Sequence, residues 1–90
     1  MVKTYTVLVE FAGGTYLSQF KASTPKQALA RWTEASTRVT GVPKKLREVM
    51  KKQLGFGDEP VAIRGLKNVW CISEEHENKL ALIHIIQTGS

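Results

Sequence analysis

Basic side chains are concentrated in one stretch of the 90-residue chain, between residues 38 and 54. Its six basic residues are Arg38, Lys44, Lys45, Arg47, Lys51 and Lys52. Only one acidic residue, Glu48, lies among them, so the stretch alone accounts for the net charge of +5. Clustered cations attract polyanions because binding releases condensed counterions. The stretch therefore predicts a contact with nucleic acid or with an acidic protein.

The arrangement of these cations depends on a helix predicted over residues 43–54. Pro43 suits its first turn, and Gly55 suits the position that ends it. The apolar residues that recur at helical spacing are Leu46, Val49, Met50 and Leu54. At 100° per residue, all five basic residues of the helix are predicted to project away from this apolar stripe. We expect a cationic outer face, with a purely solubilising role for these charges as the alternative.

The carboxy-terminal third holds the residues that suggest a metal site or catalysis. The Glu74–Glu77 run contains His76, but neighbouring residues of a turn point in different directions, and no second group of ligands accompanies it. Cys71 lies in an apolar segment, which favours the neutral thiol. No nucleophile can be placed beside His84. The sequence therefore predicts no enzymatic activity, no metal and no cofactor.

The elements that would position these residues are visible in the periodicity of the chain. Period-two patterns and apolar runs predict four strands, over residues 3–11, 15–22, 68–73 and 80–87. Thr24, Pro25 and Gln27 form a capping box with a first-turn proline, which predicts a helix over residues 25–36 with Trp32 buried. Residues 37–42 are expected to form a connection, and 61–63 a short extended segment.

The element order is β-β-α-α-β-β, which indicates the α+β class. Two amphipathic helices and four strands suit a two-layer arrangement, with a mostly antiparallel four-stranded sheet and both helices packed on one face. The strands over 3–11 and 80–87 carry the most apolar residues and are expected to be central. The length of the chain predicts a single domain over residues 1–90.

The strand predicted over residues 80–87 is apolar on both sides. Leu82 and His84 alternate along it with Ile83 and Ile85. If both helices cover one face of the sheet, one of these two pairs is left uncovered on the other. All four residues are therefore candidates for an interface with another protein or with a second copy of the chain. This interaction is the alternative to binding through the basic helix, and the two are compatible.

Cysteine content and hydropathy bear on the compartment. Cys71 is the only cysteine, so no intramolecular disulfide can form, and small secreted domains usually need several. No apolar run approaches the roughly 20 residues that span a bilayer, and the amino terminus leads directly into a strand-like pattern. We therefore predict a cytoplasmic protein without a membrane partner.

Overall fold

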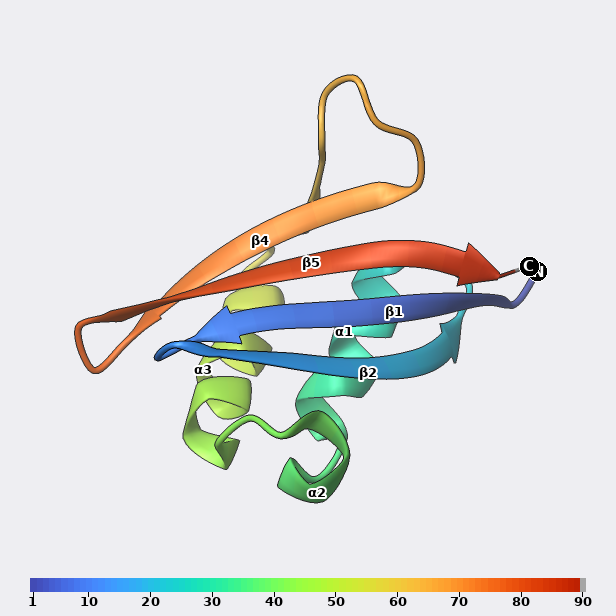
Figure 1. The fold of residues 1–90 in the computed structure, drawn as a ribbon. Coiled ribbons are helices and arrows are strands. Elements are labelled where there is room, and N and C mark those ends of the chain that lie inside the picture. Colours follow the sequence, from blue (N-terminus) through green and yellow to red (C-terminus); the bar gives the residue numbers. More distant parts are fainter. Residues whose placement is uncertain (90) are drawn as a thin grey trace.

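The computed structural model describes residues 1–89, which form three helices and one antiparallel β-sheet (Figure 1). The helices are α1 (Pro25–Glu34), α2 (Thr37–Thr40) and α3 (Lys44–Gly55). The strands are β1 (Lys3–Phe11), β2 (Gly14–Ala22), β3 (Val61–Ala62), β4 (Val69–His76) and β5 (Lys79–Gly89). They lie in the order β2-β1-β5-β4-β3, and all neighbours are antiparallel. The predicted α+β class and antiparallel sheet are confirmed.

The prediction of four strands is wrong, because β3 adds a fifth at the outer edge of β4. Val61 pairs with Cys71, and Ala62 pairs with Trp70. A strand of two residues is too short to show a period-two pattern, so periodicity alone could not identify it. The pairing with Cys71 extends the sheet one strand beyond the two hairpins.

Both hairpins close with two-residue turns. Ala12 and Gly13 join β1 to β2 with φ angles of 51° and 82°, and Glu77 and Asn78 join β4 to β5 with φ angles of 52° and 62°. Positive φ at both central residues gives a turn whose twist matches that of the strands. Since β4 extends to His76, the prediction that the whole Glu74–Glu77 run lies in a turn is wrong.

The central position of β1 and β5 is confirmed. These two strands pair with each other, and each has a further strand on its other side. Val7 lies opposite Ile85, and Val9 lies opposite Ile83. All four of these side chains are fully buried. The most apolar strands therefore occupy the middle of the sheet, where both of their edges are hydrogen-bonded.

The amino-terminal end of α1 is the one that its sequence predicts. The Thr24 hydroxyl accepts a hydrogen bond from the Gln27 backbone N–H at 3.1 Å, and the Gln27 side chain accepts one from Ser23 N–H at 2.6 Å. Pro25 occupies the first turn, where its missing N–H is not needed. The chain then forms a short helix, α2, where a plain connection was expected.

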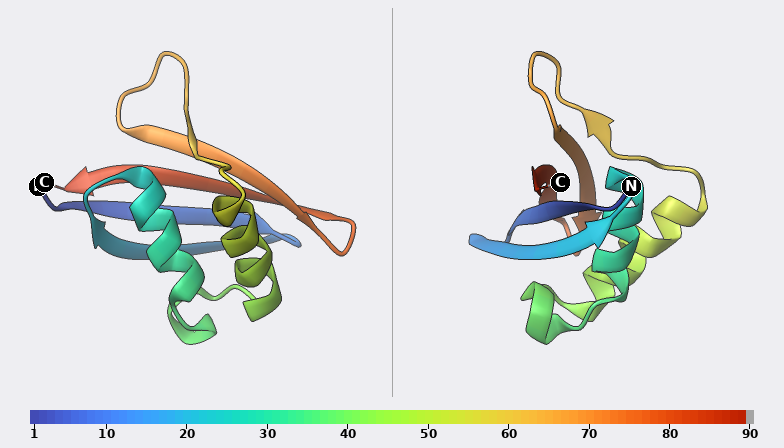
Figure 2. Two further views of the ribbon diagram at one scale, coloured as in Figure 1. Left: turned by 180° about the vertical axis from the view of Figure 1, so that it is seen from behind. Right: turned by 90° about the vertical axis from the view of Figure 1, so that its right-hand side faces the viewer.

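Helices α1 and α3 lie against one face of the sheet (Figure 2), and the core is packed between the two layers. Trp32 and Leu29 of α1 and Met50 of α3 are fully buried there, as is Ile83 of β5. Tyr5 of β1 is also buried and meets Trp70 edge to face, with ring centroids 6.0 Å apart. Burial raises the pKa of the Tyr5 hydroxyl. The predicted burial of Trp32 is confirmed.

Candidate interaction surfaces

Arg47 does not belong to the exposed cationic face, so its predicted orientation is wrong. Its side chain lies within the fold, and the residue is only 5% exposed. The helical wheel explains the difference, because Arg47 lies about 20° from Leu54 and about 60° from Met50 around the helix axis. At the border of the apolar stripe, a long side chain can turn inward when hydrogen-bond acceptors are present inside the fold.

The acceptors of Arg47 lie at the end of α1, in α2 and in the segment just before α3. Its guanidinium donates to the carbonyl oxygens of Val42 and Thr33, both at 3.3 Å, and also to that of Ala35. It donates in addition to the Thr37 hydroxyl at 2.8 Å. Two of these carbonyls belong to the carboxy-terminal end of α1, where the helix dipole favours a positive charge. Arg47 therefore holds the α1–α2–α3 corner together.

Two of the exposed cations of α3 are compensated by neighbouring carboxylates. Lys44 lies 3.9 Å from Glu48 one turn later, and Lys51 lies 3.6 Å from Glu34 of α1. The members of both pairs are more than half exposed, so each pair adds little to stability. The pairs nonetheless reduce the positive potential that these two lysines contribute on the surface.

Lys45 and Lys52 differ from the other cations of α3. Within residues 1–89, neither lysine has a carboxylate within 4.0 Å. They are seven residues apart and thus point within about 20° of each other around the helix. Both line a cavity of about 260 Å³ whose other lining residues are Glu48, Val49 and His76. Arg38 lies apart from them, exposed on α2. The structure thus brings together only part of the predicted basic site.

The sheet face opposite α1 and α3, here called the open face, turns toward the viewer in Figure 1, with both helices behind it. One apolar row crosses this face from β2 to β3, and we call it the central row. It consists of Leu17, Leu8, His84, Cys71 and Val61, each the direct cross-strand partner of the next. Leu17 is 62% exposed and Val61 66%. Apart from His84, the residues of this row are apolar, and no described helix covers them (Figure 1).

The exposed fractions of the side chains on β5 show which of the predicted interface residues are accessible. Leu82 is 38% exposed and His84 is half-buried, and both lie on this face of β5. Ile83 and Ile85 face the helices and are fully buried, so their prediction as interface residues is wrong. Sequence reasoning missed Leu8 and Leu17, although the alternation of β1 already placed Leu8 on the other face of the strand from the buried Val7 and Val9.

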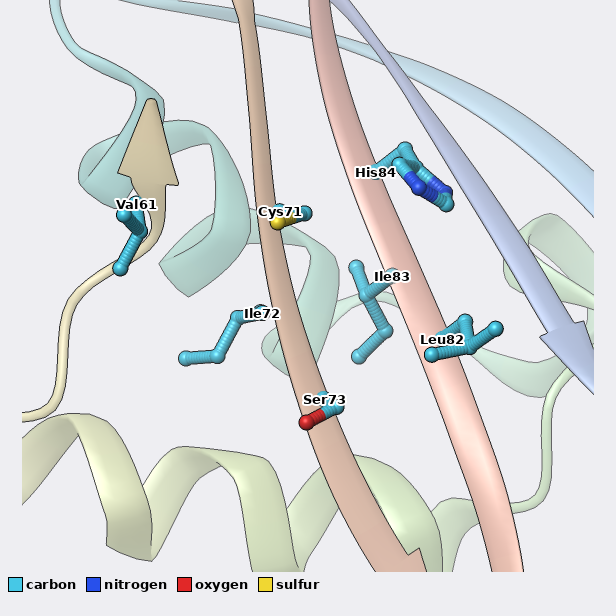
Figure 3. Close-up of a pocket in the computed structure, with 7 residues that line it drawn as sticks. All are labelled: Val61, Cys71, Ile72, Ser73, Leu82, Ile83 and His84. Atoms are coloured by element: carbon cyan, nitrogen blue, oxygen red, sulfur yellow. The ribbon is translucent and has the colours of Figure 1, made fainter. Parts of the chain in front are cut away.

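A shallow cavity of about 410 Å³ lies where β3, β4 and β5 meet (Figure 3). Its lining includes Val61, Cys71, Leu82 and His84. Five of the seven lining residues lie on the open face, and the other two, Ile72 and Ile83, belong to the helix side of β4 and β5. No cluster of three or more His, Cys, Asp or Glu side chains suited to a metal ion occurs within residues 1–89.

The two ends of the open face differ in polarity. Glu10 and Glu75 are exposed at the end where the hairpin turns lie. Lys21 is exposed at the opposite end, near a chain of hydrogen bonds in which Gln19 donates to Thr6 at 3.0 Å and Thr6 meets Thr88 at 2.9 Å. One end therefore carries negatively charged hydrogen-bond acceptors, and the other carries Lys21 and further hydrogen-bond donors.

Comparisons of the chain with protein-family models, with curated proteins and with solved structures gave no match. Among the described residues, no helix has the length and apolar character needed to cross a membrane.

Proposed function

We propose that the protein is a non-catalytic interaction module that pairs with a second copy of itself through the open face. The observation that carries this proposal is the uncovered central row, apolar except for His84, that spans all five strands. Single exposed apolar residues are normal on protein surfaces, whereas a contiguous apolar sheet face usually marks a site of association. Two copies stacked by this face would form a four-layer assembly, with helices outside and both sheets inside. With a single cysteine, the chain suits the reducing cytoplasm as its compartment.

The size of the open face is adequate for a self-paired interface. Four strands at about 4.8 Å spacing, and nine residues of β1 at about 3.3 Å each, give a flat footprint of about 570 Å² per copy. Two copies would then bury at least about 1,100 Å², which approaches the range of about 1,200–2,000 Å² for stable interfaces. A two-fold pair uses the same patch on both copies, so no second complementary surface is required.

Replacing Leu82 with lysine is expected to shift the protein from dimer to monomer. The variant would place two charges, one from each copy, in the middle of a desolvated interface, which should weaken association by at least about 100-fold. Size-exclusion chromatography with light scattering, over a series of protein concentrations, measures the change. Circular dichroism checks that the variant keeps its fold.

Phe56→Lys is the matched control for Leu82→Lys. Phe56 is 88% exposed but lies in the loop after α3, away from the open face. The Phe56→Lys substitution introduces the same charge and removes a larger apolar side chain, yet it should leave the dimer intact. A monomeric unmodified protein at high concentration, or equal weakening by both variants, would refute the proposal.

A second candidate function is binding of nucleic acid by Lys45 and Lys52. The observation that favours it is that these two cations line the same cavity and have no carboxylate within 4.0 Å among residues 1–89, since Glu48, which also lines the cavity, is paired with Lys44. In the proposed dimer, α3 remains on the outside, so both functions are compatible. Phosphate contacts by such lysines give affinity without sequence preference.

Replacing both Lys45 and Lys52 with glutamate is expected to weaken binding to a single-stranded oligonucleotide. The slope of log Kd against log salt should fall by about 1.4, since each phosphate contact on single strands contributes about 0.7. Fluorescence anisotropy between 20 and 200 mM salt, about the range in which such contacts dominate, measures it. The control Arg64→Glu with Lys67→Glu changes the net charge equally in the β3–β4 loop. If both double variants lose the same affinity, net charge alone explains binding, and the proposal that Lys45 and Lys52 form the binding site is refuted.

A further inference from the structure

We infer that the two copies pair about a two-fold axis that runs across the strands, along the central row, so that the strands of one copy oppose those of the other in direction. This inference rests on the proposed self-association and specifies its geometry. It follows from the distribution of charge and apolar residues on the open face.

The unequal ends of the open face favour this axis. A two-fold axis along the central row places the acidic end of one copy over the donor-rich end of the other. Glu10 of one copy then lies above Thr6 of the second copy and close to its Lys21. Since the interface is isologous, the same contact occurs twice. Acidic and basic groups that meet across an interface favour one orientation over its alternatives.

The other simple axis is disfavoured by the same charges. A two-fold axis along β5 would exchange the positions of β1 and β4 between the copies. Glu10 of one copy would then come beside Glu75 of the second copy, because both lie toward the hairpin end. Like charges brought together in a partly desolvated interface oppose association, and Lys21 would be left without a carboxylate.

The apolar residues next to the central row fit the same axis. Leu82 and Ile86 lie on β5, one on either side of His84. Rotation about the central row places Leu82 of one copy over Ile86 of the second copy, and the reverse contact follows from symmetry. On the row itself, Leu8 of one copy lies over Leu8 of the second copy, and Cys71 likewise lies over Cys71. Apolar side chains therefore meet apolar side chains on both sides of His84, which lies on the axis over His84 of the second copy.

Isotope-filtered NMR on a mixed dimer of labelled and unlabelled chains tests the axis. Leu82 and Ile86 are four residues apart on one strand, a separation of about 13 Å, so a methyl contact between them must come from two different copies. We expect this Leu82–Ile86 contact to be observed. A dimer that shows a Leu82–Leu82 contact between the copies, or neither contact, would overturn the axis while leaving self-association intact.

A charge exchange gives an independent test. Glu10→Lys and Lys21→Glu are each expected to weaken the dimer by about 3- to 10-fold, because each disrupts two symmetric rim contacts. The double variant restores the opposite-charge pairs and should recover the original dimer affinity. Sedimentation velocity at low salt measures the four dissociation constants, of the unmodified protein, the two single variants and the double variant. Additive weakening in the double variant would overturn the axis, whereas a protein that is monomeric under all conditions would also refute the proposed function.

Discussion

Replacing Ile85 with lysine is expected to unfold the protein or to lower its free energy of unfolding by more than about 4 kcal/mol. Ile85 is fully buried on the helix side of β5, between Val7 of β1 and Trp70 of β4. A lysine there would have to leave its charge unpaired inside the core or force the helices away from the sheet. Few single substitutions in a small domain have so large an effect. Urea denaturation followed by tryptophan fluorescence measures it.

Leu82→Lys is the matched comparison for Ile85→Lys, at a concentration where both proteins are monomeric. The two residues lie three positions apart on the same strand, but Leu82 is 38% exposed on the open face. We expect its unfolding free energy to change by no more than about 1 kcal/mol. Similar losses from both substitutions would contradict the assignment of the two faces of β5.

Replacing Arg47 with alanine is expected to lower the free energy of unfolding by about 3 kcal/mol. The substitution removes the donor for three carbonyl oxygens and the Thr37 hydroxyl, and the desolvation penalty of buried acceptors without a partner is left uncompensated. Arg47→Lys keeps the charge but not the planar array of donors, so it should recover only part of the loss. Urea denaturation at neutral pH again provides the measurement.

Lys45→Ala serves as the control for Arg47→Ala. It lies on the same helix and removes the same charge, but its side chain is exposed. The free energy of unfolding should change by less than about 0.5 kcal/mol. If Arg47→Ala proves equally mild, the hydrogen bonds at the α1–α2–α3 corner do not stabilise the fold as described. Arg47 is therefore unsuitable for tests of polyanion binding, since its loss would confuse stability with affinity.

Local sequence signals predicted most of the elements because each has its own physical cause. The cap at Thr24 and the alternation of β1 depend on residues close together in the chain, and both occur in the structure. Three of the four acceptors of Arg47, on Thr33, Ala35 and Thr37, lie ten or more residues away in the chain. No local pattern carries that information. The pairing of β3 with β4 likewise depends on the path of a loop rather than on periodicity.

The candidate surfaces were predictable only in part, for a related reason. Alternation along β5 separates Leu82 and His84 from Ile83 and Ile85. Only the packing of α1 and α3 on the sheet decides which pair is covered. The sequence also shows where the lysines of α3 lie. Which of them find a carboxylate depends on tertiary neighbours, as the contact between Lys51 and Glu34 illustrates.

Because β1 and β5 are antiparallel neighbours in the sheet, the beginning and the end of the described chain lie beside each other (Figure 1), with Thr4 paired to Gly89. Anything fused to either end would emerge at the same corner of the molecule, next to the donor-rich part of the open face. In the two-fold pair, the rotation carries that corner to the opposite side. Segments fused to the two copies of the proposed pair would therefore point in opposing directions.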